Sequence, residues 1–220
     1  MEYRSLPPAT MLNPAPVVLV SCGDENGKRN LVTVAWTGTV NSEPPMVSVS
    51  LKKERYSHGL ILSSGEYVIN LADEPMLKAV DFCGVRSGRD LDKAEAAGLT
   101  FAPAEGMRFA PGVEGAPARL SCRVRQVLEL GSHDLFLGEV VAVQVRKDLV
   151  DERGAVRLER GKLVAYSHGL YQRLGQVLGF FGYSVAREEV RQRRMAAFRN
   201  GQRREPTAAP VGRSPKAKGR

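Results

Sequence analysis

The stretch ARLSCRVRQVLELGSHDLFLGEVVAVQVRKD occupies residues 118–148 and is dominated by β-branched and aliphatic side chains. It contains two long strand-like runs, 118–130 and 134–148, separated only by Gly-Ser-His. Two such runs joined by a short connection that contains glycine predict an antiparallel hairpin. This hairpin indicates that the fold is built mainly of β-strands.

Four more strand-like stretches precede this hairpin. VVLVSCG at 17–23 and NLVTVAWTGTV at 30–40 flank a turn that contains Asn-Gly, which predicts a second hairpin. MVSVSLKK at 46–53 alternates apolar and polar residues with the two-residue period of a half-buried strand. EYVINLA at 66–72 is the fourth stretch. Six strands with few helices predict a barrel.

Helices are expected at the periphery of these strands. The sequence predicts a short helix from Ser57 to Leu62, opened by the Ser57 hydroxyl and ended at Gly65. Residues 74–97 are expected to be mainly helical, interrupted by a loop with the sequence CGVRSGRD. The predicted fold class is therefore mainly β with peripheral helices.

The charge of the chain is concentrated at one end. The 220 residues have a formal net charge of +8, yet residues 186–220 alone contain eleven Lys or Arg and three Asp or Glu. Residues 1–185 contain 21 residues of each sign. We therefore expect one folded domain over 1–185 and a basic tail over 186–220, helical at first and disordered over its last twenty or so residues. A neutral folded domain argues against a nucleic-acid-binding face on the fold itself.

Cysteine and motif content exclude several classes of site. Cys22, Cys83 and Cys122 are widely spaced and form no C-x-x-C pair, so neither a disulfide framework nor a zinc site is predicted, and a cytoplasmic location is expected. No stretch has the apolar length of a signal peptide or a membrane span, so no membrane association is expected. Walker, G-x-G-x-x-G and G-x-S-x-G signatures are absent, and the histidines are isolated in sequence. No catalytic side chain and no metal ligand is therefore assigned.

One stretch with binding chemistry is NLVTVAWTGT at 30–39. Small residues around Ala35 and Gly38 would let a planar ring approach the strand, and threonine hydroxyls lie on either side of them. The alternative is that threonine is simply a good strand former and that Trp36 is an ordinary core anchor. Composition alone leaves both interpretations open.

A second stretch, SLKKERYS at 50–57, offers chemistry suited to phosphate. It places two lysines and Arg55 beside Ser50 and a serine at the expected start of a helix, where amide dipoles and cations favour anions. The alternative is a solvated strand end whose charges only keep the surface soluble.

Taken in order along the chain, several motifs resemble those of the flavoredoxin branch of the flavin reductase-like family. They are PVVLVSCG, N-x-x-T-V-A-W, S-E-P-P-M-V-S-V-S-x-K-K-E-R-x-S, D-F-C-G-V-R-S-G-R-D-x-D-K, ELGSHDLFLGEVV and LGxxLGFFGYSV. The resemblance covers roughly residues 10–185 and leaves the basic tail outside.

The resemblance implies a six-stranded Greek-key split β-barrel that forms a homodimer and holds one FMN per subunit noncovalently at the subunit interface. The resemblance places Thr33, Ala35 and Trp36 along the flavin. It places Ser50 and Lys53 near the ribityl-phosphate side of FMN, and Arg55 with Ser57 on the phosphate. In the loop expected to cover the flavin, Cys83, Ser87 and Lys93 become candidates for ring or nicotinamide contacts. A single thiol without a resolving partner is more typical of a small buried residue than of a redox centre.

The function implied by the resemblance is electron transfer from NADH or NADPH, through FMN, to a small-molecule or protein acceptor. The cofactor carries the chemistry, so the protein needs no acid or base of its own. One rival is an FMN-dependent electron carrier that never turns over NAD(P)H. A second is a nucleic-acid-binding protein that uses the basic tail, which could also bind polyanions weakly and without specificity.

Overall fold

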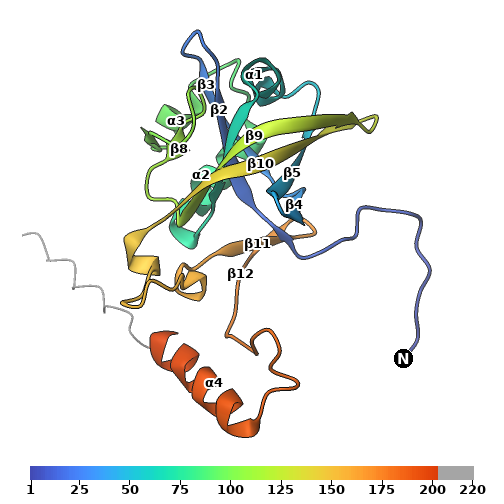
Figure 1. Cartoon of the computed structure of the whole chain (residues 1–220). Coiled ribbons are helices and arrows are strands. Elements are labelled where there is room, and N and C mark those ends of the chain that lie inside the picture. The colour runs from blue at the N-terminus through green and yellow to red at the C-terminus, as the bar shows by residue number, and fades with distance from the viewer. Residues whose placement is uncertain (203–220) are drawn as a thin grey trace, which may run out of the picture. The chain divides into compact units, whose positions relative to one another are not determined.

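A computed structural model describes residues 1–202 of the chain and the side chains up to residue 198. The expected disorder after about residue 200 falls almost wholly outside the described residues. The chain divides into two compact units, Met1–Gly175 and Gln176–Arg220. The first unit is mainly β, as expected (Figure 1). Its boundary lies earlier than residue 185, and the proposed division into 1–185 and 186–220 stays a prediction.

Seven strands form the main sheet of the first unit. In spatial order they are β3 (Arg29–Val34), β2 (Val18–Gly23), β6 (Glu66–Leu71), β9 (Ala118–Glu129), β10 (His133–Val145), β5 (Pro45–Lys52) and β4 (Thr37–Ser42). All neighbouring pairs are antiparallel. In Figure 1 the long β9–β10 hairpin, in yellow-green and yellow, lies across the front of the barrel.

The sheet closes because of how the chain passes from β3 to β4. These two strands lie at opposite edges of the sheet, yet only Ala35 and Trp36 separate them in sequence. The sheet therefore has to curl until its edges approach each other, which makes a barrel that is split at this point. If β3 and β4 are counted as one bent strand, the sheet has six strands, which agrees with the predicted number. After β5 the chain crosses to pair β6 with β2, the non-sequential connection of a Greek key.

Alternation along the strands fills the barrel interior. In β5, every second residue is buried, which is the period-two pattern read from the sequence. Tyr67 and Phe136 are the largest side chains that are fully buried inside the barrel. Strand β2 is buried along its whole length because a second apolar cluster, with Leu19 and Leu31, covers its other face. Both apolar clusters also include residues of β3, and β3 carries much of the site described below.

Smaller elements surround the barrel. The two further sheets are β1 (Ala15–Pro16) with β11 (Val164–Ser167) and β12 (Leu170–Arg173), and β7 (Phe101–Ala102) with β8 (Gly112–Val113). The helices of this unit are α1 (Tyr56–Ser64), η1 (Glu74–Met76), α2 (Leu77–Val85), α3 (Lys93–Ala96), η2 (Lys147–Leu149) and η3 (Leu158–Arg160). Strands β11 and β12 arise from a segment for which the sequence predicted no strand.

Two local predictions can be compared with helix α1. Gly65 ends the helix with a φ of 66°, in the left-handed region that glycine adopts without strain, as predicted. The prediction that the Ser57 hydroxyl opens the helix is wrong. The N-cap is Arg55, no side chain caps the first amides, and Ser57 lies inside the first turn.

The second unit contains α4 (Glu188–Gln202), which confirms the helix predicted from the sequence. Within this unit the Arg194 guanidinium lies 4.1 Å from the centre of the Phe180 ring. Phe180 and Tyr183 meet with their ring centres 6.3 Å apart. Two glutamates occupy the first turn of α4, where the helix dipole favours negative charge.

Candidate flavin site

Two cavities adjoin at the split in the barrel, and each has a volume of about 340 Å³. They share Val32 of β3 and Arg55, the residue that precedes α1. One cavity is lined mainly by cations and hydroxyl groups, and the other mainly by aromatic and small side chains. We call them the cationic cavity and the aromatic cavity. Together they form one candidate site with two chemically different ends.

Three basic side chains of the cationic cavity are held in place by main-chain carbonyls. Arg55 Nη1 donates to the Gly84 carbonyl at 3.1 Å, and Arg89 Nη1 donates to the Glu54 carbonyl at 2.7 Å. Lys93 Nζ donates to the Cys83 carbonyl at 2.8 Å, and the lysine is only 4% exposed. Burial lowers the pKa of this ammonium group. Carbonyls orient these cations without neutralising them.

A polar pair at the start of α1 completes this cavity. Ser57 is fully buried, and its Oγ accepts a hydrogen bond from Asn30 Nδ2 at 2.8 Å. A hydroxyl that accepts one hydrogen bond keeps its own proton free to donate. The first amides of α1 have no side-chain cap, and Tyr56 and Ser57 of its first turn line this cavity. The arrangement offers several donors and a positive helix terminus to an anion.

The loop after α2 closes over Asn30 and Tyr56. Ser87 of this loop lines the cationic cavity, and its Oγ accepts from the Arg89 amide at 3.2 Å. Gly88 lies so close that a Cβ atom there would be 2.1 Å from Asn30 Oδ1. Any other residue here would force the loop, Asn30 or Tyr56 to shift.

Besides Arg55, four predicted residues line the aromatic cavity: Thr33, Ala35, Trp36 and Ser50. Thr33 donates its hydroxyl to the Val80 carbonyl, which ties β3 to α2. The Ser50 amide donates to the Trp36 carbonyl at 2.9 Å and bridges the break between β3 and β4. Ala35 and Trp36 form the break itself. The predicted stretch 30–39 thus contributes directly to one wall.

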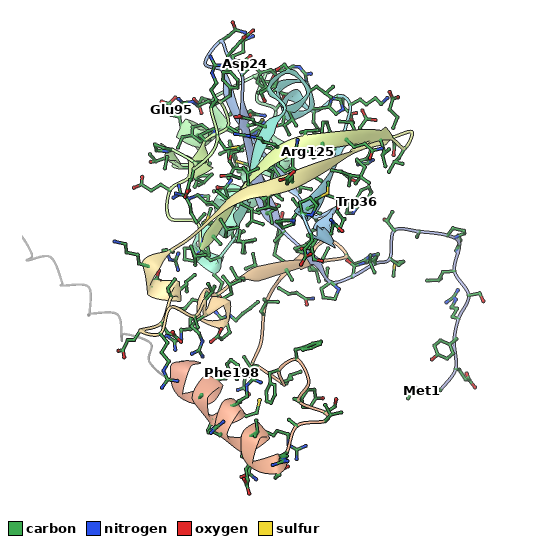
Figure 2. All side chains as sticks on the ribbon, viewed as in Figure 1. Met1, Asp24, Trp36, Glu95, Arg125 and Phe198 are labelled. Carbon is green, nitrogen blue, oxygen red and sulfur yellow. The ribbon has the colours of Figure 1, made fainter. Side chains whose placement is uncertain are left out.

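Aromatic rings surround this cavity. Trp36 is 48% exposed, so the alternative that it is an ordinary core anchor is wrong; Figure 2 shows it projecting beside β4. Its ring centre lies 4.6 Å from that of His133. Tyr166 and Tyr171, from β11 and β12, meet edge to face at 5.6 Å. Burial, with the hydrogen bond from Tyr171 to Asp81, raises the pKa of Tyr171 to about 12, so this phenol keeps its proton at physiological pH.

The structure does not bring Lys53 and Cys83 together with the other predicted residues. Lys53 lines neither cavity, and its Nζ lies 2.6 Å from Glu129 and 3.5 Å from Asp134. The hydrogen bond to Glu129 raises the pKa of this lysine. Cys83 is fully buried in α2, where burial raises the pKa of its thiol to about 11. Cys83 therefore reaches the site only through its carbonyl, which holds Lys93.

Several lining residues were not predicted from the sequence. They are Asn30, Tyr56, Arg86, Arg89, His133, Tyr166 and Tyr171. Arg86 and Arg89 stand within the quoted motif of the covering loop, so a search of that motif for cations would have found them. Asn30 and Tyr56 likewise stand within the quoted stretches 30–39 and 50–57, whereas Tyr166 and Tyr171 are far away in sequence and carry no local signal of this kind.

The pattern of these residues agrees with a comparison to known families. A profile of the flavin reductase like domain matches residues 10–175, which covers the barrel and both cavities. The chain belongs to the flavin reductase-like family. Its fold is the split barrel of that family, and the structural neighbours include flavoredoxins.

Three solved structures illustrate the similarity. Flavoredoxin of Desulfovibrio vulgaris (Miyazaki F) is 28% identical, covers 81% of this chain and is itself covered to 97%, with a TM-score of 0.76. Flavoredoxin from Methanosarcina acetivorans is 26% identical, and the match covers 84% of this chain and 100% of the flavoredoxin, with a TM-score of 0.77. An FMN-binding protein from Thermus thermophilus, solved with bound 1-cyclohex-2-enone, is 29% identical. The match covers 79% of this chain and 95% of that protein, with a TM-score of 0.66.

Three further findings concern the described residues of this flavin reductase-like chain. None of their helices is both long and apolar enough to cross a membrane. Within the same part of the chain, no group of three or more His, Cys, Asp or Glu side chains is arranged to hold a metal ion. All three cysteines are buried and free.

Proposed function

We propose that this chain binds FMN noncovalently and transfers electrons between NADH or NADPH and a second acceptor. The observation that carries the proposal is the junction of the cationic and aromatic cavities at Arg55 and Val32. FMN joins a phosphate to a planar ring system, so it needs an anion site and a ring site next to each other. The donors and the aromatic walls of this site fit that requirement.

Each predicted contact has a chemical reason. Arg55 and the Ser57 hydroxyl would hold the phosphate together with the first amides of α1. Thr33, Ala35 and Trp36 would lie along the ring. Bound FMN would supply the redox chemistry, and the protein would position the cofactor and exclude water. Lys53 and the Cys83 thiol are left out because neither lines the site.

Replacing Arg55 and Ser57 together with alanine tests the phosphate assignment. The double variant should bind FMN roughly ten-fold or more weakly, since one charged hydrogen bond contributes about 1.5–3 kcal/mol. Riboflavin, which has no phosphate, should be less affected. Arg153→Ala with Ser63→Ala is the matched control, because neither residue lines a cavity. An unchanged FMN dissociation constant in the test variant would remove the assignment.

Anaerobic mixing of the FMN-loaded protein with NADH or NADPH tests the electron donor. Rapid bleaching of the flavin absorbance band supports NAD(P)H turnover. Bleaching by a reduced carrier protein alone would favour the alternative, an FMN-dependent electron carrier. The electron acceptor is then sought among small molecules and redox proteins by following reoxidation of the band.

We further propose that the chain works as a homodimer in a reducing compartment such as the cytoplasm. Three buried, free thiols support the reducing compartment. The exposed apolar residues of the barrel, among them Trp36, Val40 and Val143, support burial against a second copy. Sedimentation equilibrium gives the mass in solution, and a monomer at micromolar concentration would contradict the dimer.

A further inference from the structure

The cationic cavity holds more positive charge than a single phosphate requires. Four basic residues line it: Arg55, Arg86, Arg89 and Lys93. Among its described lining residues, Glu54 is the one carboxylate, and this side chain is 68% exposed and 3.6 Å from Lys52. A phosphate monoester brings about −1.5 to −2 charges at neutral pH. With Glu54 counted, one such group would leave a net charge of about +1 to +1.5 uncompensated in the cavity.

The hydrogen bonds within the cavity leave this charge available to a ligand. Arg55, Arg89 and Lys93 donate to main-chain carbonyls and to no carboxylate. In the part of the chain that the structure describes, the Arg86 guanidinium makes no hydrogen bond or ion pair. Like charges gathered without counter-ions destabilise a fold, so such a cluster indicates an anionic ligand.

The cations come from two different elements. Arg55 and Ser57 lie at the start of α1 and can act on one phosphate. Arg86 and Arg89 lie on the loop between α2 and α3 and are exposed, with the Arg89 guanidinium 5.6 Å from the centre of the Tyr56 ring. At about 340 Å³ the cavity has the volume of roughly ten water molecules, more than the four oxygens of one phosphate occupy.

We propose that Arg86 and Arg89 form a subsite for a second phosphate group, beside the one that Arg55 and Ser57 bind. The inference rests on the proposed function, because the first phosphate is taken to be that of FMN or of the equivalent half of a larger flavin nucleotide. The second phosphate belongs either to a flavin dinucleotide or to the nicotinamide dinucleotide. In both cases the shared chemistry is a nucleotide phosphate bound by paired guanidinium groups.

The test compares ligands with and without the second phosphate. The protein freed of flavin is titrated with FMN and with FAD, and the FMN-loaded protein is titrated with NAD⁺ and with NADP⁺, all at one ionic strength. The variants are Arg86→Gln alone, which loses no contact within the protein, and Arg86→Gln with Arg89→Gln. Lys147→Gln with Arg153→Gln removes the same charge from exposed positions outside both cavities and is the control.

We expect the double variant to lose roughly ten-fold in affinity per broken charged hydrogen bond for the ligand that carries the second phosphate, and much less for FMN. A loss confined to FAD places the phosphate on the flavin. A loss confined to NAD⁺ or NADP⁺ places it on the nicotinamide dinucleotide, and a loss for NADP⁺ alone identifies the 2′-phosphate. The proposal is overturned if FMN weakens as much as the other ligands, or if neither variant differs from the control.

The same titrations separate this inference from the proposed function. Tight FMN binding by the unchanged protein, with no selective loss in the variants, overturns the second subsite alone. Failure of the unchanged protein to bind FMN overturns the proposed function and the second subsite with it.

Discussion

Asn30 positions the Ser57 hydroxyl through a hydrogen bond. Its Nδ2 donates to Ser57 Oγ at 2.8 Å, so the Ser57 hydroxyl, which lines the cationic cavity, keeps its own proton available to donate. An aspartate at position 30 would offer only acceptors, so the Ser57 proton would turn toward the new carboxylate. The negative charge of the introduced aspartate would also repel the phosphate. We therefore predict that Asn30→Asp weakens FMN by roughly ten-fold or more, a larger effect than on riboflavin.

Fluorescence titration with both flavins measures this effect. The control is Asn26→Asp in the exposed turn between β2 and β3, which lines neither cavity. Equal weakening of FMN and riboflavin would indicate a general loss of structure instead of a lost phosphate contact.

Asp134 is a buried carboxylate with two basic neighbours. Its side chain is 6% exposed, and its Oδ2 lies 2.7 Å from His58 Nε2. Burial by itself raises the pKa of Asp134, but the hydrogen bond from His58 and the charge of Lys53 lower it below the ordinary value. A carboxyl whose pKa is lowered in the folded state stabilises the fold above the unfolded pKa of about 3.9. That stability is lost as the pH falls through the folded-state pKa.

We predict that Asp134→Asn removes this pH dependence. The variant should be less stable than the wild type near about pH 7 and should lose less of its remaining stability below about pH 4. Urea unfolding at several pH values gives the free energies. A variant that loses stability in acid as steeply as the wild type would show that another carboxylate is responsible.

At the scale of elements, the β3–β4 break and the loop after α2 form the walls of the site. The loop can approach β3 only because residue 88 has no side chain, since a Cβ atom would lie 2.1 Å from Asn30 Oδ1 and 2.9 Å from Tyr56 Cδ1. Gly88→Ala should therefore displace the loop, lower thermal stability and weaken FMN binding. Gly59→Ala is the control, because nothing lies within 4 Å of a Cβ there and alanine favours a helix by about 1 kcal/mol. Normal FMN affinity in Gly88→Ala would contradict a role for the loop in binding.

The sequence predicts elements whose cause is local. The hairpin at 118–148 and the strands near 17–23 and 66–72 follow from side-chain alternation and turn residues, and the structure confirms them. The break at Ala35 and Trp36 has no local signal, since neither residue is a turn former such as glycine, proline, asparagine or aspartate. It arises because the two edges of the curled sheet must meet. Its cause lies in the whole barrel and not in the stretch itself.

The same distinction applies to the site. Arg55 and Ser57 were assigned because a run of motifs in order identified the family, although Ser57 does not cap the helix as expected. Lys53 was assigned with them but turns to Glu129, because the neighbouring hairpin supplies a carboxylate that the local sequence does not reveal. Tyr166 and Tyr171 reach the ring end of the site through strands that pair with β1 and with each other. Long-range pairing of this kind cannot be predicted from composition.

At the scale of the whole molecule, charge and binding site belong to different parts of the chain. Every residue that lines either cavity lies at or before Tyr171. The excess charge lies in residues 186–220, with eleven cations and three carboxylates, and the preceding residues carry 21 of each sign. The two parts can therefore be tested separately.

Removing residues 187–220 should leave FMN affinity, NAD(P)H-dependent bleaching and the dimer unchanged, because none of the lining residues is lost. The full chain should bind a polyanion such as heparin weakly, and this binding should fall steeply between about 50 and 200 mM salt as counter-ion release becomes less favourable. The shortened chain, left with equal numbers of both charges, should not bind heparin at any of these salt concentrations. Titration with FMN, sedimentation equilibrium and elution from a heparin column measure the three properties. Loss of FMN binding on truncation would show that the tail supports the barrel. Heparin binding that survives truncation would place the polyanion site on cations of the barrel itself. The cations of the cationic cavity would then be the first to substitute.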